Sequence, residues 1–367
     1  MGDLLISKKP SGLLVAVTLL LCWFSMPSTT MAQISTGPVI QLPYTLNVFA
    51  TSTDKYSQPD SIVRWRDRII IGFSNGVAKD GTDDKSSTIV EYSLDGKVKR
   101  TFSVPGHNDG LLVVGEDDLW SLQNEDGNPN LAVIDLESGH QKLFTFAPTV
   151  HGGGFDDMQV KDGKVLVTAS NPALNGAGQN VFPALVIATL HGSMVDVQPI
   201  LNGDASATDI PTGAAIAALN LTDPDSLKID PRGSVVLDDQ GDGQLIFIRH
   251  PFSNNPVVGR LSLTRADTGK MTTVDDTAFA SDPRAFLLVS DLAGGADLRG
   301  VVYRIDSPTF GFEPGTPYSA SDTDGFVGVL NLDNGVITPI VTGLGSGRGM
   351  LFVAPDENDN RDGTEDR

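Results

Sequence analysis

A short phrase recurs along this chain, in which an Asp is followed by one or two small or polar residues and then by a run of apolar residues. Its copies start at Asp60, Asp109, Asp157, Asp225 and Asp276. Successive copies are about 50 residues apart, except for a longer interval of about 70 residues before Asp225. Self-similarity at this spacing is typical of repeat architectures. It predicts a β-propeller in which each copy opens the innermost strand of one blade.

The composition favours strands and turns over helices. The chain holds 39 Gly and 22 Pro among its 367 residues, and apolar residues keep no helical period for longer than about two turns. After Asp60, apolar runs at residues 61–65, 68–73, 87–93 and 98–104 predict antiparallel strands, with a turn at Leu94-Asp95-Gly96-Lys97 before the last. Four strands joined by tight turns make one propeller blade.

The same plan predicts further blades along the chain. We expect the second, third and fourth within residues 110–146, 158–200 and 226–263. The fifth should combine residues 277–279 with 285–290, 325–332 and 336–341, and residues 350–353 should open a sixth that residues 39–50 complete from the other terminus. The prediction is an all-β, six-bladed propeller with four-stranded antiparallel blades, and five or seven blades are the alternatives. The extra segments 202–221 and 306–324 are expected to roof the channel mouth.

The N-terminal segment predicts export. Lys8 and Lys9 precede an apolar run at residues 13–24, and small residues follow up to Ala32, which is the layout of a secretory signal peptide. We expect residues 1–32 to be cleaved, residues 33–355 to form one domain and residues 356–367 to be an acidic, disordered tail. The mature protein is then secreted or periplasmic. The apolar run is too short for a membrane span. A lipid anchor at Cys22 is the alternative, although Leu19-Leu20-Leu21 lacks the small residues usual before a lipidated Cys.

The net charge and the cysteine content exclude some classes of partner and of chemistry. The net charge of −20 repels nucleic acid phosphates and anionic lipids, which excludes both as partners. Cleavage removes the chain's one Cys, so the mature protein has no disulfide and no thiol chemistry. We expect a monomer whose partner is a small-molecule substrate or an extracytoplasmic protein or glycan.

The repeated Asp predicts a ring of carboxylates at one rim of the central channel, because equivalent inner strands start at the same end. The ring would comprise Asp60, Asp109, Asp157, Asp225 and Asp276. Converging carboxylates repel one another, and a divalent cation relieves that repulsion with the oxygen ligands that Ca²⁺ prefers. In the alternative, each Asp accepts hydrogen bonds from its own following amides and only forms a turn.

Two phrases resemble the inner-strand motifs of the regucalcin/gluconolactonase-like six-bladed propellers. One is Pro224-Asp225-Ser226-Leu227-Lys228-Ile229-Asp230, and the other begins at Asp276-Thr277-Ala278-Phe279. The resemblance implies that Asp225 and Asp276 are metal ligands and that the activity is hydrolysis of lactones or esters. The family's first-blade Glu ligand has no counterpart in Ser57-Gln58-Pro59-Asp60, and the two phrases occur in the opposite order along the chain.

Further residues beside the ring suit a hydrolytic site. His107 and His151 lie just upstream of ring Asp residues and are candidate general bases, although a loop His is more often structural. Arg348 opens the sixth inner strand, where it would either clamp a substrate carboxylate or neutralise the ring. The alternative function is a non-catalytic propeller that binds a protein, glycan or small ligand through its rim loops.

Overall fold

The structure, a computed structural model, describes residues 37–355. Its regular elements in this range are strands, and no helix here is long and apolar enough to cross a membrane. The strands pair into five hydrogen-bonded sheets. The predicted signal peptide and acidic tail lie outside the described residues.

The first sheet has the order β3-β4-β5-β6. Its strands are β3 (Pro59–Trp65), β4 (Arg68–Phe73), β5 (Ser86–Ser93) and β6 (Val98–Pro105). All of its pairs are antiparallel, as predicted for the first blade. Strand β4 is buried along most of its length because both of its faces pack against neighbouring sheets.

The second sheet joins two predicted blades in the order β11-β12-β13-β14-β10-β9-β8-β7. Its strands are β7 (Asn108–Val114), β8 (Asp118–Gln123), β9 (Asn130–Asp135), β10 (Gln141–Phe146), β11 (Met158–Lys161), β12 (Lys164–Thr168), β13 (Pro183–His191) and β14 (Met194–Asn202). The joint is a short parallel pairing of the outer strands β10 and β14. This pairing covers two strand edges that would otherwise be exposed.

The third sheet has the order β16-β15-β20-β19-β18-β17. Its strands are β15 (Ala207–Asp209), β16 (Ala215–Ile216), β17 (Pro224–Ile229), β18 (Val235–Asp239), β19 (Gln244–Arg249) and β20 (Val257–Ser262). The β15–β16 hairpin pairs with the outer strand β20. Residues 202–221 therefore extend the sheet at its outer edge, and the prediction that they roof the channel was wrong.

The remaining two sheets exchange segments of the chain. One contains β23 (Asp276–Phe279), β26 (Pro317–Ser321), β27 (Phe326–Leu330), β28 (Val336–Thr342), β21 (Thr264–Arg265), β22 (Lys270–Met271) and β1 (Val39–Ile40). The other contains β29 (Gly347–Val353), β24 (Phe286–Asp291), β25 (Val301–Asp306) and β2 (Thr45–Thr51). The chain thus runs in one sheet from β21 to β23, crosses to the other for β24 and β25, returns for β26 to β28, and crosses again for β29.

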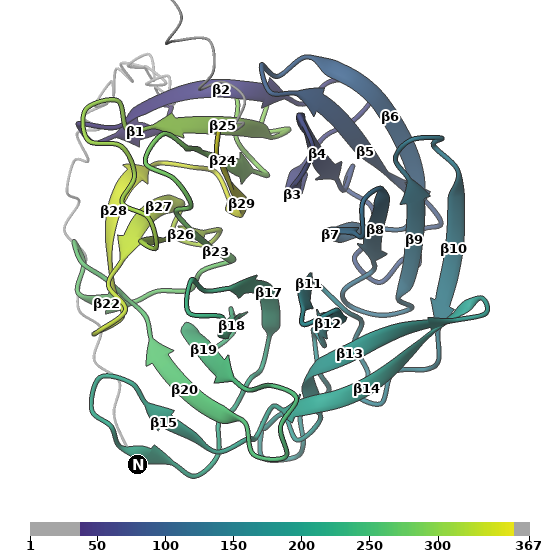
Figure 1. Ribbon diagram of the computed structural model, residues 1–367, viewed down its shortest axis with the longest axis vertical. Coiled ribbons are helices and arrows are strands. Elements are labelled where there is room, and N and C mark those ends of the chain that lie inside the picture. Colours follow the sequence, from purple (N-terminus) through teal and green to yellow (C-terminus); the bar gives the residue numbers. More distant parts are fainter. Residues whose placement is uncertain (1–36, 356–367) are drawn as a thin grey trace, which may run out of the picture. The chain divides into compact units, whose positions relative to one another are not determined.

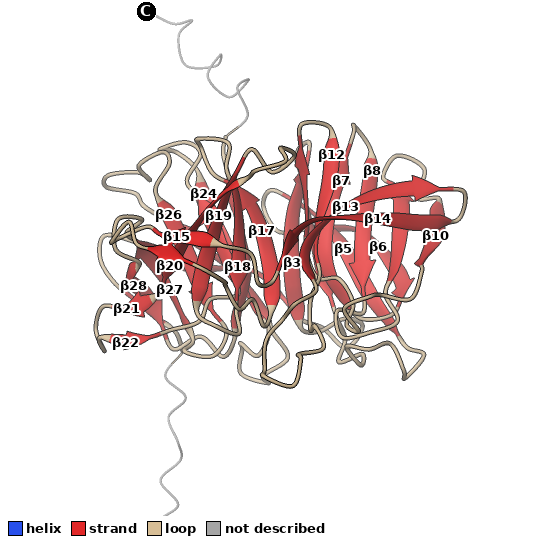
Figure 2. Ribbon diagram, turned by 90° about the horizontal axis from the view of Figure 1, so that it is seen from below, coloured by secondary structure: helices blue, strands red, loops and turns tan. Residues whose placement is uncertain are grey.

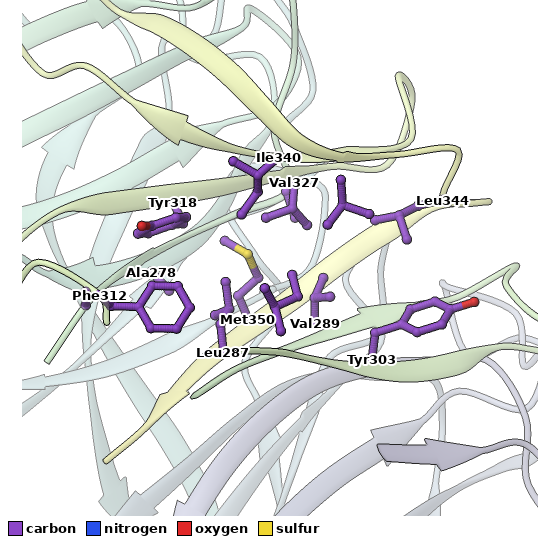
Figure 3. Close-up of a cluster of buried hydrophobic side chains, with 14 of the residues drawn as sticks. Ala278, Leu287, Val289, Tyr303, Phe312, Tyr318, Val327, Ile340, Leu344 and Met350 are labelled. Carbon is purple, nitrogen blue, oxygen red and sulfur yellow. The ribbon is translucent and has the colours of Figure 1, made fainter. Parts of the chain in front are cut away.

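This exchange corrects the predicted fifth blade. Strand β24 pairs with β25 and β29, whereas β23 pairs with β26, which lies inside the segment 306–324 that was predicted to be an insertion. Both candidate partners of β23 are short apolar runs, so strand pattern alone does not distinguish them. Packing decides which strand pairs with β23, because side chains of the two sheets share one continuous hydrophobic core. In Figure 3, Leu287 and Met350 from one sheet lie beside Ala278, Tyr318 and Val327 from the other.

The innermost strands form a closed ring in the order β3, β7, β11, β17, β23 and β29 (Figure 1). Strand β2, from the N-terminal part of the chain, pairs with β25 in the sheet that holds β29, so the predicted closure by both termini is confirmed. Strand β1 instead pairs with β28 in the neighbouring sheet. The sheets are unequal in size and are not separate four-stranded units. Figure 2 shows the strands from the side, with loops at both ends of the ring.

Candidate functional site

A bulge at the start of several inner strands turns side chains toward the channel. In β3, Pro59 pairs with Phe73 and the next pair is Ile62 with Ile71, so that Asp60 and Ser61 lie between the two pairs. Strands β7, β17 and β29 show the same register shift. A bulge of this kind bends the strand and re-aims its side chains. It places Asp60, Asp109, Asp225 and Arg348 at equivalent positions.

The residue after the ring position fastens the neighbouring inner strand on some of the strands. Ser61 Oγ accepts the N–H of Leu111 at 3.0 Å. Asp157 Oδ2 accepts the N–H of Leu227 at 2.9 Å, and Asp276 Oδ2 accepts that of Met350 at 2.7 Å. Asp157 and Asp276 therefore take the position of Ser61.

The ring position itself is filled one residue earlier on two of the strands. Asp156 and Asp275 precede the fastening residues Asp157 and Asp276, as Asp60 precedes Ser61. The ring position is therefore occupied by Asp156 and not Asp157 before β11, and by Asp275 and not Asp276 at the start of β23. The doublets Asp156-Asp157 and Asp275-Asp276 were the available signal, but sequence alone does not show which Asp of a doublet faces the axis.

Two layers of carboxylates line one cavity at the centre of the ring, with a volume of about 150 Å³. The upper layer is formed by the ring positions Asp60, Asp109, Asp156, Asp225 and Asp275, and the lower layer by the strand-fastening residues Asp157 and Asp276. The charged lining of the cavity consists of Asp60, Asp109, Glu125, Asp156, Asp157, Asp225, Lys228, Asp275, Asp276 and Arg348. The structure therefore brings together all five Asp residues of the predicted ring, together with Arg348. Glu125 was missed because it lies outside the recurring phrase, and Lys228 because the equivalent residues of other copies, Val63 and Leu112, are apolar.

The lower layer of the cavity is already neutralised by a lysine. Lys228 Nζ lies 2.8 Å from Asp276 Oδ1 and 3.6 Å from Asp157 Oδ2. Burial raises the pKa of Asp157, and the Lys228 ammonium opposes that rise. Each of these two carboxylates also accepts an amide N–H from a neighbouring inner strand, so Asp157 and Asp276 are strand-fastening groups in this structure.

Arg348 neutralises one side of the upper layer. Its Nη1 lies 3.3 Å from Asp60 Oδ2 and 3.1 Å from Asp275 Oδ1. This is the ion pairing that the sequence left open as one of two roles for Arg348. Its role as a clamp for a substrate carboxylate stays a prediction.

A candidate cation site lies on another side of the ring, where His107, Asp109 and Glu125 meet. Their ligand atoms lie within 4.8 Å of one another, and all three residues are buried. His107 Nε2 is 3.2 Å from Asp109 Oδ1, and the N–H of Glu125 donates to Asp109 Oδ2 at 3.1 Å. Glu125 follows strand β8, which pairs with β7, and so reaches the ring from the second strand of the sheet.

The tautomer of His107 makes this group fit a metal ion. His107 Nδ1 lies 2.6 Å from the carbonyl oxygen of Val77, so Nδ1 must donate its hydrogen there. Burial lowers the pKa of His107, which favours the neutral ring with a lone pair on Nε2. That lone pair faces a carboxyl oxygen, and two acceptors in contact need a proton or a cation between them. An imidazole held through Nδ1–H, with two carboxylates, is a common donor set for divalent ions.

Glu125 also belongs to a carboxyl pair with opposite pKa shifts. Burial acts to raise the pKa of Glu125, but a hydrogen bond with Asp156 and the nearby Lys79 ammonium outweigh it and hold that pKa at about 2. Burial, reinforced by the Asp225 and Glu125 charges, raises the pKa of Asp156 well above its usual value. Asp156 is therefore the member of the pair that carries the shared proton.

His151 lies away from this arrangement. Its Nε2 donates to the carbonyl oxygen of Gly154 at 2.6 Å, and its ring meets the edge of Phe155 at 5.3 Å between centroids. The loop that carries His151 needs a glycine at residue 153, because a Cβ at Gly153 would collide with the backbone carbonyls that pack against it. Among the described residues, His151 is not part of the cavity lining. Its predicted role as a base stays a prediction without a supporting contact.

The buried carboxyls predict that the protein loses stability as the pH rises. Burial, opposed by Arg348, raises the pKa of Asp60 from 3.8 to about 6, and burial raises that of Asp239 to about 8. The folded protein then holds protons that the unfolded chain has released, so stability falls between pH of about 4 and 8. We expect the melting temperature without divalent ions to be several degrees lower at pH of about 8 than at about 5. Asp60→Asn should flatten the lower part of this profile, and a melting temperature that rises over the same range would contradict the expectation.

Comparisons with known proteins find similar solved structures but no family. No protein-family model and no curated protein matches this chain. Similar solved structures include selenomethionine-substituted virginiamycin B lyase from Staphylococcus aureus, with 10% identity, coverage of 86% of this chain and 76% of that one, and a TM-score of 0.43. A putative gluconolactonase has 12% identity, covers 83% of each chain and gives a TM-score of 0.44. A protein of unknown function from Bacteroides caccae has 11% identity, coverage of 81% and 87%, and a TM-score of 0.43.

At these identities and with TM-scores below 0.5, the likeness carries no argument about the family or the activity of this chain. The chemistry of the site depends on the geometry of its own residues.

Proposed function

We propose that this protein is a divalent-cation-dependent hydrolase of lactones or esters, with its site at the channel mouth. The observation that carries the proposal is the contact between His107 Nε2 and Asp109 Oδ1 beside Glu125, which a bound cation would satisfy. The charged groups of the ring open onto a cavity large enough for a small ligand.

The cation would be held by His107, Asp109 and Glu125. When bound, such an ion polarises a substrate carbonyl as a Lewis acid. Ca²⁺ is the predicted ion, and the imidazole ligand adds Mn²⁺ and Zn²⁺ as candidates, because nitrogen donors suit those ions better. The carboxylates that line the cavity are buried, which strengthens the charge interactions among them.

Two ring carboxyls suit the proton transfers of hydrolysis. Asp60 stands on β3 beside β7, and its pKa of about 6 allows it to accept a proton from water near neutral pH. The raised pKa of Asp156 keeps this carboxyl protonated at pH values where an Asp is usually ionised, so it can donate a proton to a leaving alkoxide. Arg348, on the neighbouring inner strand β29, holds Asp60 in place through its ion pair.

A non-catalytic binding propeller is the second candidate. It is favoured by the ion pairs of Lys79, Lys228 and Arg348, which already neutralise part of the ring without an added ion. In that case the ring aspartates would serve the fold, and the partner would be a protein, glycan or small ligand at the rim loops.

The proposal also covers the number of blades, the export of the protein and its oligomeric state. We count six blades around the six inner strands β3, β7, β11, β17, β23 and β29, with the parallel β10–β14 pairing as a bridge between two of them. We also propose that residues 1–32 direct the protein out of the cytoplasm and that it acts as a monomer on small molecules.

The test is an activity screen with metal control. The purified protein is stripped of metal and offered neutral lactones and aryl esters with Ca²⁺, Mn²⁺ or Zn²⁺, or with excess chelator. We expect hydrolysis that one of these ions restores and the chelator abolishes. Full turnover in chelator would overturn the metal dependence. Tight ion binding without turnover of any substrate would favour the binding propeller.

A further inference from the structure

The loop between β4 and β5 reaches across to the candidate cation site from the neighbouring sheet. This loop, residues 74–85, is fixed against the loop that follows β8. The N–H of Asp126 donates to the carbonyl oxygen of Lys79 at 3.1 Å, and Asn128 Nδ2 donates to that of Asp80 at 3.0 Å. The backbone at Lys79 is therefore held in place beside Glu125.

The same loop contacts the site at two points. The carbonyl oxygen of Val77 accepts the hydrogen of His107 Nδ1 and so selects the tautomer with a free Nε2. Two residues later, Lys79 Nζ forms an ion pair with Glu125 Oε1. The same loop therefore fixes the tautomer of one candidate ligand, His107, and also places the Lys79 ammonium beside another, Glu125.

The two cations cannot occupy the site independently. An ammonium beside Glu125 and a divalent ion held by the same carboxylate would repel each other strongly in a partly buried site. The Lys79 side chain is 46% exposed, whereas that of Glu125 is 9% exposed. Lys79 can therefore move its ammonium into solvent on a flexible stem, while Glu125 stays in the site.

We propose that Lys79 is a resident ammonium that competes with the divalent ion for Glu125 and sets the affinity of the site. This inference rests on the proposed cation site. In the ion-free protein, Lys79 neutralises Glu125 and keeps it ionised. Ion binding displaces the ammonium to the channel mouth, so the affinity is lower than the three ligands alone would give.

The test is calorimetric titration of the metal-free protein with Ca²⁺, Mn²⁺ and Zn²⁺ at mildly alkaline pH, where Glu125 stays ionised. Lys79→Met keeps the length of the side chain and removes its charge. We expect this variant to bind the ion about tenfold more tightly or better than the wild type. Lys79→Arg retains the charge and should bind less tightly than Lys79→Met.

Lys85→Met is the matched control. Lys85 lies at the end of the same loop, and its ammonium pairs with Asp83 at 2.9 Å in an exposed position. Its removal changes the net charge equally but should alter the affinity by less than about twofold, because salt screens such a charge. Thermal unfolding of each variant checks folding, and Lys79→Gln replaces Lys79→Met if the latter does not fold.

The outcomes separate this inference from the proposed function. If the wild type and Lys79→Met bind the ion equally, the competition is overturned and the cation site stands. If only Lys79→Met binds, the competition is supported and a metal-dependent activity of the wild type is overturned. If neither binds, both proposals fail.

Discussion

Replacing Lys228 by Met is expected to lower the free energy of unfolding by about 3 kcal/mol or more. Lys228 supplies the ammonium between Asp157 and Asp276, and both carboxylates are buried and fastened to neighbouring strands. Met keeps the volume of the side chain but leaves two like charges facing each other. Removing one partner of a buried ion pair is costly because the remaining charge has no counterion.

Urea unfolding of the metal-free protein at neutral pH measures this loss. Lys161→Met is the matched control, because Lys161 is on β11 and its ammonium lies 3.7 Å from Asp162, a carboxylate with 66% exposure. The control should change stability by less than about 1 kcal/mol, because the pair is long and its carboxylate is exposed to solvent. Equal effects of the two substitutions would show that Lys228 has no special role in the channel.

Asp109→Asn and Glu125→Gln are each expected to weaken divalent-ion binding by more than about 100-fold. Even residues that only support a ligand are often worth about 10- to 100-fold in metal affinity, and these carboxylates are proposed as ligands themselves. Both substitutions keep the size of the side chain and remove its charge. Calorimetric titration with the ion that binds the wild type most tightly measures the loss.

Asp276→Asn distinguishes this site from the ligand set that the family resemblance implied. Asp276 Oδ1 pairs with Lys228, and Oδ2 accepts the N–H of Met350, so it has a structural role without any ion. We expect its substitution to lower the melting temperature while changing ion affinity by less than about threefold. Loss of binding in Asp276→Asn with retention in Asp109→Asn would move the ion to the lower layer of the cavity.

The candidate site was only partly predictable. The repeated Asp identified the rim, because equivalent inner strands begin at the same end of a propeller. His107 was found because it lies two residues before the ring residue Asp109. Glu125 and Lys79 carry no such signal, because each occurs once and reaches the rim from a second strand or a neighbouring loop.

The sequence by itself determined most of the strands, the approximate starts of the inner strands and that the N-terminal strand closes the sheet of the last one, but it missed β25 and β26. These features follow from local pattern and from the repeat. Only the tertiary structure decided that β24 joins β29 and not β23, and which Asp of each doublet faces the axis. The physical reason is that strand partners and bulges are selected by packing and hydrogen bonds between distant segments, and several partners fit the same local pattern equally well.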